Sequence, residues 1–236
     1  MQGNADSAAK FDPSRAAEYE QQSRIALAGY DACHELAACL LSAALGEESA
    51  AHLLVVGAGG PAQEITKSAK LQPGWRYTAV DPSQPMLDIA RACIHEAGLA
   101  NRTQVVPGHM ENLEEEAVFD AATLIGVLHH LPGETTKLEI LKAIAKHLKP
   151  GAPFIVAGNH YAYASQPLLL AAWGERWRMQ GATHDEIQAK LGKILQGADP
   201  PHSEEAIFKL LELAGFVSPL RFFSSLFWGA WICYRA

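Results

Sequence analysis

The sequence predicts an α/β fold: a Rossmann-like, seven-stranded, doubly wound sheet that ends in an antiparallel hairpin and carries a helical cap insertion. Two observations lead to this prediction. Between residues 52 and 157, apolar segments of strand length alternate with amphipathic helical segments, which is typical of a parallel sheet with helices on both faces. After residue 215, two apolar segments follow each other with a very short link, which predicts a hairpin that closes the sheet at one edge.

The individual elements are predicted from length and local signals. We expect strands at 52–57, 75–80, 103–107, 119–125, 153–157, 217–224 and 227–235. We expect helices at 61–70, 83–97, 134–147 and 203–214. Pro61 is tolerated in the first turn of its helix, Ser83 is a suitable N-cap, and Lys149-Pro150-Gly151 is a stop signal. Phe227 and Trp228 are expected in the core of an edge strand.

Two helical regions fall outside this alternation. Residues 15–45 are rich in Ala and Leu at helical spacing, and Gly29 is expected to bend or divide them. Residues 160–200 contain a long amphipathic helical segment that interrupts the strand-helix order. We therefore predict an N-terminal helical cover (1–50) and a main domain (51–236), with a cap insertion (160–200) inside the main domain.

Composition and charge exclude several classes of function. The chain has 236 residues, 49% of them hydrophobic, and can bury a substantial core. Its formal net charge is −7 and no stripe of Lys and Arg is present, so nucleic acid is not expected as a partner. The polar N-terminus and the absence of a run of about 18 apolar residues predict a cytoplasmic protein with no membrane partner. The four cysteines lack metal-like spacing, so no metal is expected.

The most informative residues are a glycine turn and an acid. The segment 53–60 runs from an apolar strand into glycines before a helix, which predicts free backbone N–H groups facing a polar ligand. Asp81 ends the next strand, where its carboxylate can accept hydrogen bonds from both ribose hydroxyls. Gly57-x-Gly59-x-x-Ala62 fits the dinucleotide fingerprint and also the looser turn of S-adenosylmethionine (SAM) methyltransferases, so the turn alone leaves both cofactors open.

Over roughly residues 11–236 the chain resembles class I SAM-dependent methyltransferases. Besides the terminal hairpin, three further segments carry this resemblance. They are residues 79–87 (Ala-Val-Asp-Pro-Ser-Gln-Pro-Met-Leu), the block 119–132 with its His-His-Leu, and residues 148–151. The resemblance implies SAM as the cofactor and S-adenosylhomocysteine as the product. It also implies the cofactor-binding residues Tyr30, Gly57, Ala58, Gly59, Asp81, Pro82, Met86, His109, Met110 and Ile125.

The chain more distantly resembles the carboxy-SAM synthases of the tRNA wobble-uridine pathway. The shared features are Phe11-Asp12 followed by Gly29-Tyr30, and Ala214-Gly215-Phe216 near the end. Three places depart from the related families. Val55 and His109 stand where an acid is usual. Where the synthases need an arginine, this chain has Leu191 and Gly192 with lysines nearby, which lack the bidentate fork, so we expect ordinary SAM.

Methyl transfer requires positioning and, for some acceptors, removal of a proton, so no obligatory triad is expected. His129 and His160 follow strands at the ligand-binding edge, and we predict them as catalytic or orienting residues; packing within their loops is the alternative. Four aromatic residues are predicted to enclose a flat acceptor: Tyr161, Tyr163, Trp173 and Trp177. For the two tryptophans the alternative is packing of their helix onto the domain.

These observations predict a SAM-dependent methyltransferase, monomeric or homodimeric, that acts on a small-molecule acceptor at O, N or S in a covered pocket. Three alternatives stay open. The first is an enzyme like the carboxy-SAM synthases or one that modifies tRNA. The second is a non-catalytic SAM-binding sensor or partner protein. The third is a dehydrogenase, which lacks support because no sufficiently large substrate domain follows residue 100.

Overall fold

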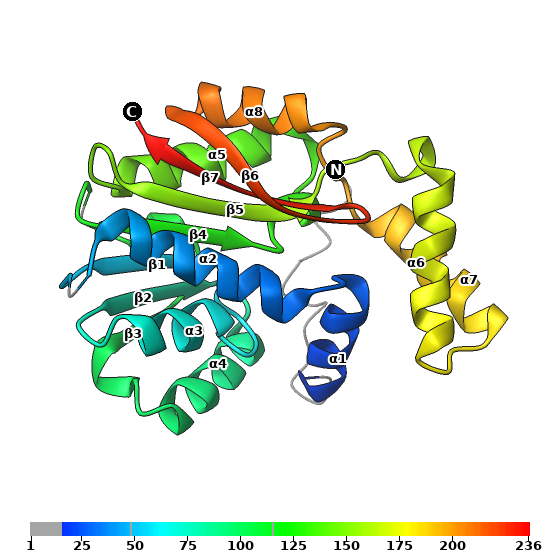
Figure 1. Ribbon diagram of the computed structural model, residues 1–236, viewed down its shortest axis with the longest axis horizontal. Helices are drawn as coiled ribbons and strands as arrows, with labels where there is room; N and C mark the ends of the chain where they lie inside the picture. The colour runs from blue at the N-terminus through cyan, green and yellow to red at the C-terminus, as the bar shows by residue number, and fades with distance from the viewer. Residues whose placement is uncertain (1–15, 48, 115) are drawn as a thin grey trace.

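The computed structural model describes residues 16–47, 49–114 and 116–236, and its centre is one seven-stranded sheet with the order β3-β2-β1-β4-β5-β7-β6 (Figure 1). The strands are β1 (His52–Val56), β2 (Arg76–Asp81), β3 (Thr103–Pro107), β4 (Ala121–Ile125), β5 (Pro153–Asn159), β6 (Phe216–Ser225) and β7 (Trp228–Arg235). The first five strands are parallel to one another, and β7 is antiparallel to β5 and β6. The predicted sheet with its C-terminal hairpin is therefore confirmed.

Helices cover both faces of this sheet. On one face, α2 (Tyr30–Leu45), α3 (Gln63–Leu71) and α4 (Gln84–Glu96) contribute to a core with β1, β2 and the inward side of β7. On the other face, α5 (Gly133–His147) and α8 (Glu204–Leu213) form a second core. Short 3-10 helices connect the layers: η3 (Ala100–Arg102), η4 (Met110–Asn112), η5 (Leu128–His130) and η6 (Tyr163–Ser165). The arrangement is doubly wound, as predicted.

Three local predictions can be compared with the structure. Ser83 caps α4, because its Oγ accepts a hydrogen bond from the Met86 amide at 3.4 Å. Pro61, however, precedes α3, so its predicted place in the first turn was wrong. The amide of Gly60 donates to Met86 O at 3.0 Å, which holds the turn against α4 before the helix begins. The edge-strand prediction for Trp228 was also wrong, because β7 lies between β5 and β6.

The first helix and the insertion meet on one side of the sheet, whereas the second helix runs along a face of the sheet (Figure 1). Gly29, at φ 83°, separates α1 (Ala16–Ala26) from α2, as predicted. The insertion forms α6 (Pro167–Met179) and α7 (His184–Gly197). A third apolar cluster joins α1, α6, α7 and Phe227 at the hairpin turn. Phe11 and Asp12 lie outside the described residues.

Side chains of α6 bind the last carbonyls of α1. Trp173 Nε1 donates to Ala26 O at 2.8 Å, and Arg176 donates to Ile25 O at 2.7 Å and to Arg24 O at 3.0 Å. The final carbonyls of a helix have no partner within the helix, so these three bonds satisfy groups that would otherwise need water. We call these three bonds the latch. They join two covers that are far apart in the sequence.

Candidate active site

Two adjoining cavities open at the carboxyl ends of the parallel strands. The first, of about 320 Å³, lies beside the ends of β1, β2 and β4 and is here named the strand-end cavity. The second, of about 550 Å³, lies between the sheet, α1, α6 and α7 and is named the covered cavity. Both are lined by Gly57, Gly59, Ile125, Gly126 and His130. A ligand in one cavity can therefore touch a ligand in the other at the glycine turn.

The amides of the glycine turn bond to the protein itself. Gly57 and Ala58 donate to Val80 O at 2.8 and 3.2 Å, and Gly59 donates to Asp81 Oδ2 at 3.0 Å. The expectation of free N–H groups at this turn was therefore wrong, because the neighbouring strand β2 supplies their acceptors. Gly57 has φ 74°, and a Cβ there would lie 2.2 Å from Val127 Cγ2. The protein's own packing thus requires glycine at this position.

Asp81 holds the turn and also faces the strand-end cavity. Its Oδ2 accepts from the Gly59 amide and its Oδ1 from the Ser83 amide at 2.8 Å. Burial raises the pKa of this carboxyl, and the two amide bonds and the nearby His109 oppose that rise. Each carboxylate oxygen has a second lone pair, so Asp81 keeps the capacity to accept from ligand hydroxyls.

The structure gathers most of the predicted cofactor residues around the strand-end cavity. Its lining includes Gly57, Gly59, Asp81, Pro82, Met86, His109, Met110 and Ile125. Tyr30 lines the covered cavity instead. Ala58 lines neither cavity, because its side chain is 1% exposed and belongs to the core beneath the turn. That these residues contact a bound cofactor stays a prediction.

The predicted acceptor residues divide into two groups. Tyr163, Trp173 and Trp177 line the covered cavity. His160 and Tyr161 do not line it. His160 is fully buried, with Nδ1 3.0 Å from Phe227 O, and burial lowers its pKa, an effect only partly offset by this bond. Tyr161 packs against the apolar cluster of α6 and α7.

His129 lies in the wall of the covered cavity as a neutral imidazole. Burial, followed by the electrostatic effects of His130 and Lys137, holds its pKa well below the usual range. Its Nδ1 accepts from the Asn159 amide at 3.4 Å, so the ring proton lies on Nε2. In this tautomer His129 can donate a hydrogen bond, but it has no free nitrogen to take a proton. The geometry supports the orienting role over the basic one.

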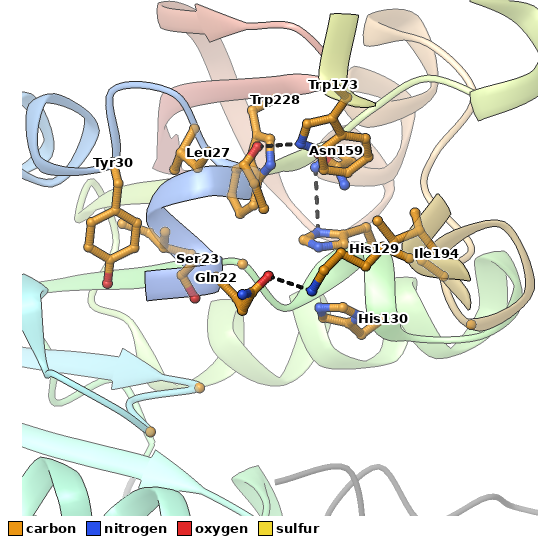
Figure 2. Close-up of a pocket in the computed structure, with 18 of the residues that line it drawn as sticks. Gln22, Ser23, Leu27, Tyr30, His129, His130, Asn159, Trp173, Ile194 and Trp228 are labelled. Atoms are coloured by element: carbon orange, nitrogen blue, oxygen red, sulfur yellow. Dashed lines mark hydrogen bonds between the residues drawn. The ribbon is translucent and has the colours of Figure 1, made fainter. Parts of the chain in front are cut away.

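Other residues that line the covered cavity could not be assigned to it from the sequence, among them Gln22, Glu64, Asn159 and Trp228. Figure 2 shows Gln22, Asn159 and Trp228 in the cavity wall. Gln22 Oε1 accepts from Lys190 Nζ at 3.0 Å and from Trp177 Nε1 at 3.2 Å. Asn159 had a sequence signal, because it is a polar residue that ends an apolar strand at the ligand-binding edge. The other three had none that distinguishes them from surface or core residues.

Comparison with known proteins identifies the region that forms the strand-end cavity. Residues 54–154 match a family model described as a methyltransferase domain. The cypemycin N-terminal methyltransferase of Streptomyces sp is 32% identical over 88 residues, which are 37% of this chain and 34% of that protein. The ubiquinone biosynthesis O-methyltransferase of Xanthomonas axonopodis pv. citri is 29% identical over 111 residues, 47% of this chain and 44% of that protein. The matches thus span less than half of either relative.

Solved structures share the fold over most of this chain. A putative O-methyltransferase from Nostoc punctiforme superposes with a TM-score of 0.63 and 16% identity, covering 86% of this chain and 55% of that one. At this identity the likeness establishes the fold. Within the described residues, no helix has the length and apolar character to cross a bilayer. The same residues contain no group of three or more His, Cys, Asp or Glu side chains arranged to hold a metal ion.

Proposed function

We propose that this chain, which carries a methyltransferase domain of the class I fold, transfers the methyl group of SAM to a small-molecule acceptor bound in the covered cavity. One observation carries the proposal: the two cavities meet at Gly57, Gly59, Ile125, Gly126 and His130. SAM supplies an electrophilic methyl group on a sulfonium. A cofactor in the strand-end cavity can present that group at the junction to an acceptor on the other side.

The residues of the strand-end cavity fit an adenosine. Asp81 offers a carboxylate with unused lone pairs at the end of β2, suited to two adjacent hydroxyls. Met110 and Ile125, both buried, provide apolar surface for a flat base, and exposed His109 lies at its rim. We assign the ribose to Asp81 and the adenine to the surface between Met110 and Ile125.

The charged amino group of the cofactor needs a different partner from the usual acid of the family. That place is taken by Val55, which is 1% exposed inside β1 and carries no charge. Among the described residues that line the covered cavity, Glu64 is the one with a carboxylate, and it lies there together with Gly57, Gly59 and Tyr30. We assign Glu64 as the partner of the cofactor's ammonium group.

The remaining residues position the acceptor and exclude water. Trp173 and Trp177 form apolar walls, and Nε2–H of His129 is available to orient a lone pair of the acceptor. We take oxygen as the first acceptor atom to test, because a curated relative and the Nostoc punctiforme structure are both described as O-methyltransferases. Nitrogen is the second, because the Streptomyces relative is an N-terminal methyltransferase.

The test is transfer of an isotopic methyl group from SAM to a panel of hydroxylated, amino and thiol aromatic compounds, with methylated product and S-adenosylhomocysteine quantified by mass spectrometry. We expect a hydroxyl compound to be methylated in proportion to S-adenosylhomocysteine formed. Micromolar SAM binding with no product from the panel would favour the non-catalytic alternative. Methylation of transfer RNA alone would favour the RNA-modifying alternative, and NAD binding without SAM binding would favour the dehydrogenase.

A further inference from the structure

Two buried polar atoms in the wall of the covered cavity lack a hydrogen-bond partner within the part of the chain that the structure describes. They are Asn159 Oδ1, an acceptor, and Trp228 Nε1, whose N–H is a donor. Their residues line the cavity and are 3% and 9% exposed. A buried polar atom without a partner destabilises a protein, so such atoms are uncommon. Because both residues line the cavity, a ligand bound there could supply the missing partners.

The two residues are direct neighbours across the sheet. Asn159, the last residue of β5, is paired with Trp228, the first residue of β7. Side chains of directly opposite residues point to the same face with Cβ atoms about 4.5–5.5 Å apart. His129 contacts both, because its Nδ1 accepts from the Asn159 amide and its ring centre lies 5.2 Å from that of Trp228 (Figure 2). The side chains that carry the acceptor and the donor are thus neighbours on one face of the sheet.

Both groups are held in place by the surrounding chain. Asn159 Nδ2 donates to the Tyr163 hydroxyl at 2.7 Å, which commits the amide nitrogen to the protein and leaves the amide oxygen without a partner among the described residues. Burial raises the pKa of Tyr163 to about 12, so this partner stays an uncharged hydroxyl. The indole of Trp228 lies against the turn after β4, where a Cβ on Gly126 would be 3.6 Å from its Cη2. Gly126 lines both cavities, so the indole lies close to their junction.

We propose that Asn159 and Trp228 form a polar anchor that binds a neutral hydroxyl group on an aromatic acceptor; this rests on the proposed function. The hydroxyl oxygen accepts from the indole N–H, and the hydroxyl proton is donated to Asn159 Oδ1. A carboxylate cannot donate to Asn159, and an ammonium cannot accept from Trp228. Neither side chain removes a proton, so the anchor positions the acceptor.

The surroundings of the anchor fit an aromatic compound of two or three rings. Trp173 and Trp177 line the same cavity, with ring centres 5.4 Å apart, and provide flat apolar surface. A volume of about 550 Å³ lies within the usual range for small-molecule sites. Lys190 and Lys193 also line this cavity, from α7. The experiment therefore has to separate a neutral hydroxyl from an anion attracted by these lysines.

The experiment compares three probes that share one ring system: 2-naphthol, 2-methylnaphthalene and 2-naphthoate. Their dissociation constants are measured by equilibrium dialysis against the full chain, with and without S-adenosylhomocysteine. We expect 2-naphthol to bind roughly 10- to 100-fold more tightly than 2-methylnaphthalene, because the hydrocarbon leaves both atoms unpaired. In Asn159→Leu and in Trp228→Phe this ratio is expected to fall by about tenfold.

The ratio of the two dissociation constants distinguishes the anchor from a purely structural role of Asn159 and Trp228. A change in the shape of the cavity alone would weaken the binding of all three probes to a similar extent. Trp231→Phe is the matched control: its Nε1 already donates to Glu204 Oε1 at 2.7 Å, and it does not line the cavity, so the ratio is expected to stay unchanged. If Trp228→Phe does not fold, Asn159→Leu carries the test. An unchanged ratio in Asn159→Leu, or 2-naphthoate binding as tightly as 2-naphthol, would overturn the anchor. If the protein prefers 2-naphthol to 2-methylnaphthalene but does not bind S-adenosylhomocysteine, the proposed function would be rejected. The proposal of the anchor would then still hold.

Discussion

The strand-end cavity and the covered cavity differ in how their polar groups are satisfied. In the first, the acid and the turn bond to each other, since Asp81 accepts from the amides of Gly59 and Ser83. In the second, Asn159 Oδ1 and Trp228 Nε1 have no partner among the described residues. A site for one constant ligand can be completed by the protein in advance, whereas a site that selects its ligand has to leave groups for that ligand to satisfy. The following changes test this contrast.

The largest effect is expected for Asp81→Ala. The change removes the proposed acceptor for two ribose hydroxyls, so the binding of S-adenosylhomocysteine should weaken by about 3–6 kcal/mol, at about 1.5–3 kcal/mol for each hydrogen bond to a charged group. Calorimetry measures this directly. Asp88→Ala is the matched control, because Asp88 is exposed on α4, binds Gln84 and Arg91, and lines neither cavity. Equal losses in both variants would contradict the assignment.

The contrast also explains what could be predicted from the sequence. The strand-end cavity is built where strands of the alternating region end, and Gly57, Gly59 and Asp81, which the local sequence pattern singled out, line it. The internal bonding of the turn could not be predicted, because it depends on how β2 lies against β1.

The covered cavity depends on contacts between distant segments. Trp228 reaches Asn159 because β7 inserts between β5 and β6, and a strand pattern alone does not give that order. Gln22 meets Trp177 and Lys190 through packing of α1 on the insertion. Aromatic composition predicted Tyr163, Trp173 and Trp177 at this site, but it gave no information on which polar groups would remain unpaired.

A smaller effect is expected for Glu64→Gln. This change tests whether the amino-acid part of the cofactor extends from the strand-end cavity to Glu64 in the covered cavity. Loss of the negative charge should weaken S-adenosylhomocysteine binding by about 1.5 kcal/mol, because a charge-assisted hydrogen bond to the ammonium group is lost. Binding of 5′-methylthioadenosine, which lacks the amino-acid part, should not change. Glu35→Gln is the control, since Glu35 is exposed and pairs with Lys67. An equal loss for both ligands would contradict the assignment of Glu64.

His129 connects the covered cavity to the pH dependence of stability. Its pKa in the folded state lies well below the unfolded value of about 6.5, so the unfolded chain binds more protons between these two values. The free energy of unfolding is therefore unaffected by protonation of His129 above about pH 6.5. As the pH falls below this value, the free energy of unfolding decreases by at most about 1.4 kcal/mol per pH unit.

Urea unfolding between pH 7.5 and 5 measures this slope. His129→Asn keeps an acceptor for the Asn159 amide and removes the titrating group, so its slope should be shallower. His160, whose pKa is also lowered, contributes in the same direction and is unaffected by the change. A slope that stays the same in the variant would show that His129 is not buried as a neutral imidazole.

The smallest effect is expected for Trp173→Phe, which removes one bond of the latch. Loss of the hydrogen bond to Ala26 O should lower the free energy of unfolding by about 1 kcal/mol. Trp75→Phe is the matched control, because Trp75 Nε1 donates to Ser49 Oγ at 2.7 Å and lines neither cavity. Both variants should lose similar stability, but only Trp173→Phe should accelerate dissociation of 2-naphthol. Equal rates of 2-naphthol dissociation in the two variants would show that the latch does not control exchange of the acceptor.

The latch has a kinetic consequence for the whole molecule. Because α6 supplies the donors for the final carbonyls of α1, any movement of α6 away from the cavity also uncaps α1. Gly29, in the left-handed conformation between α1 and α2, is a place where α1 could pivot relative to α2. If the acceptor of the proposed reaction enters by displacement of α6, each exchange also breaks these three bonds.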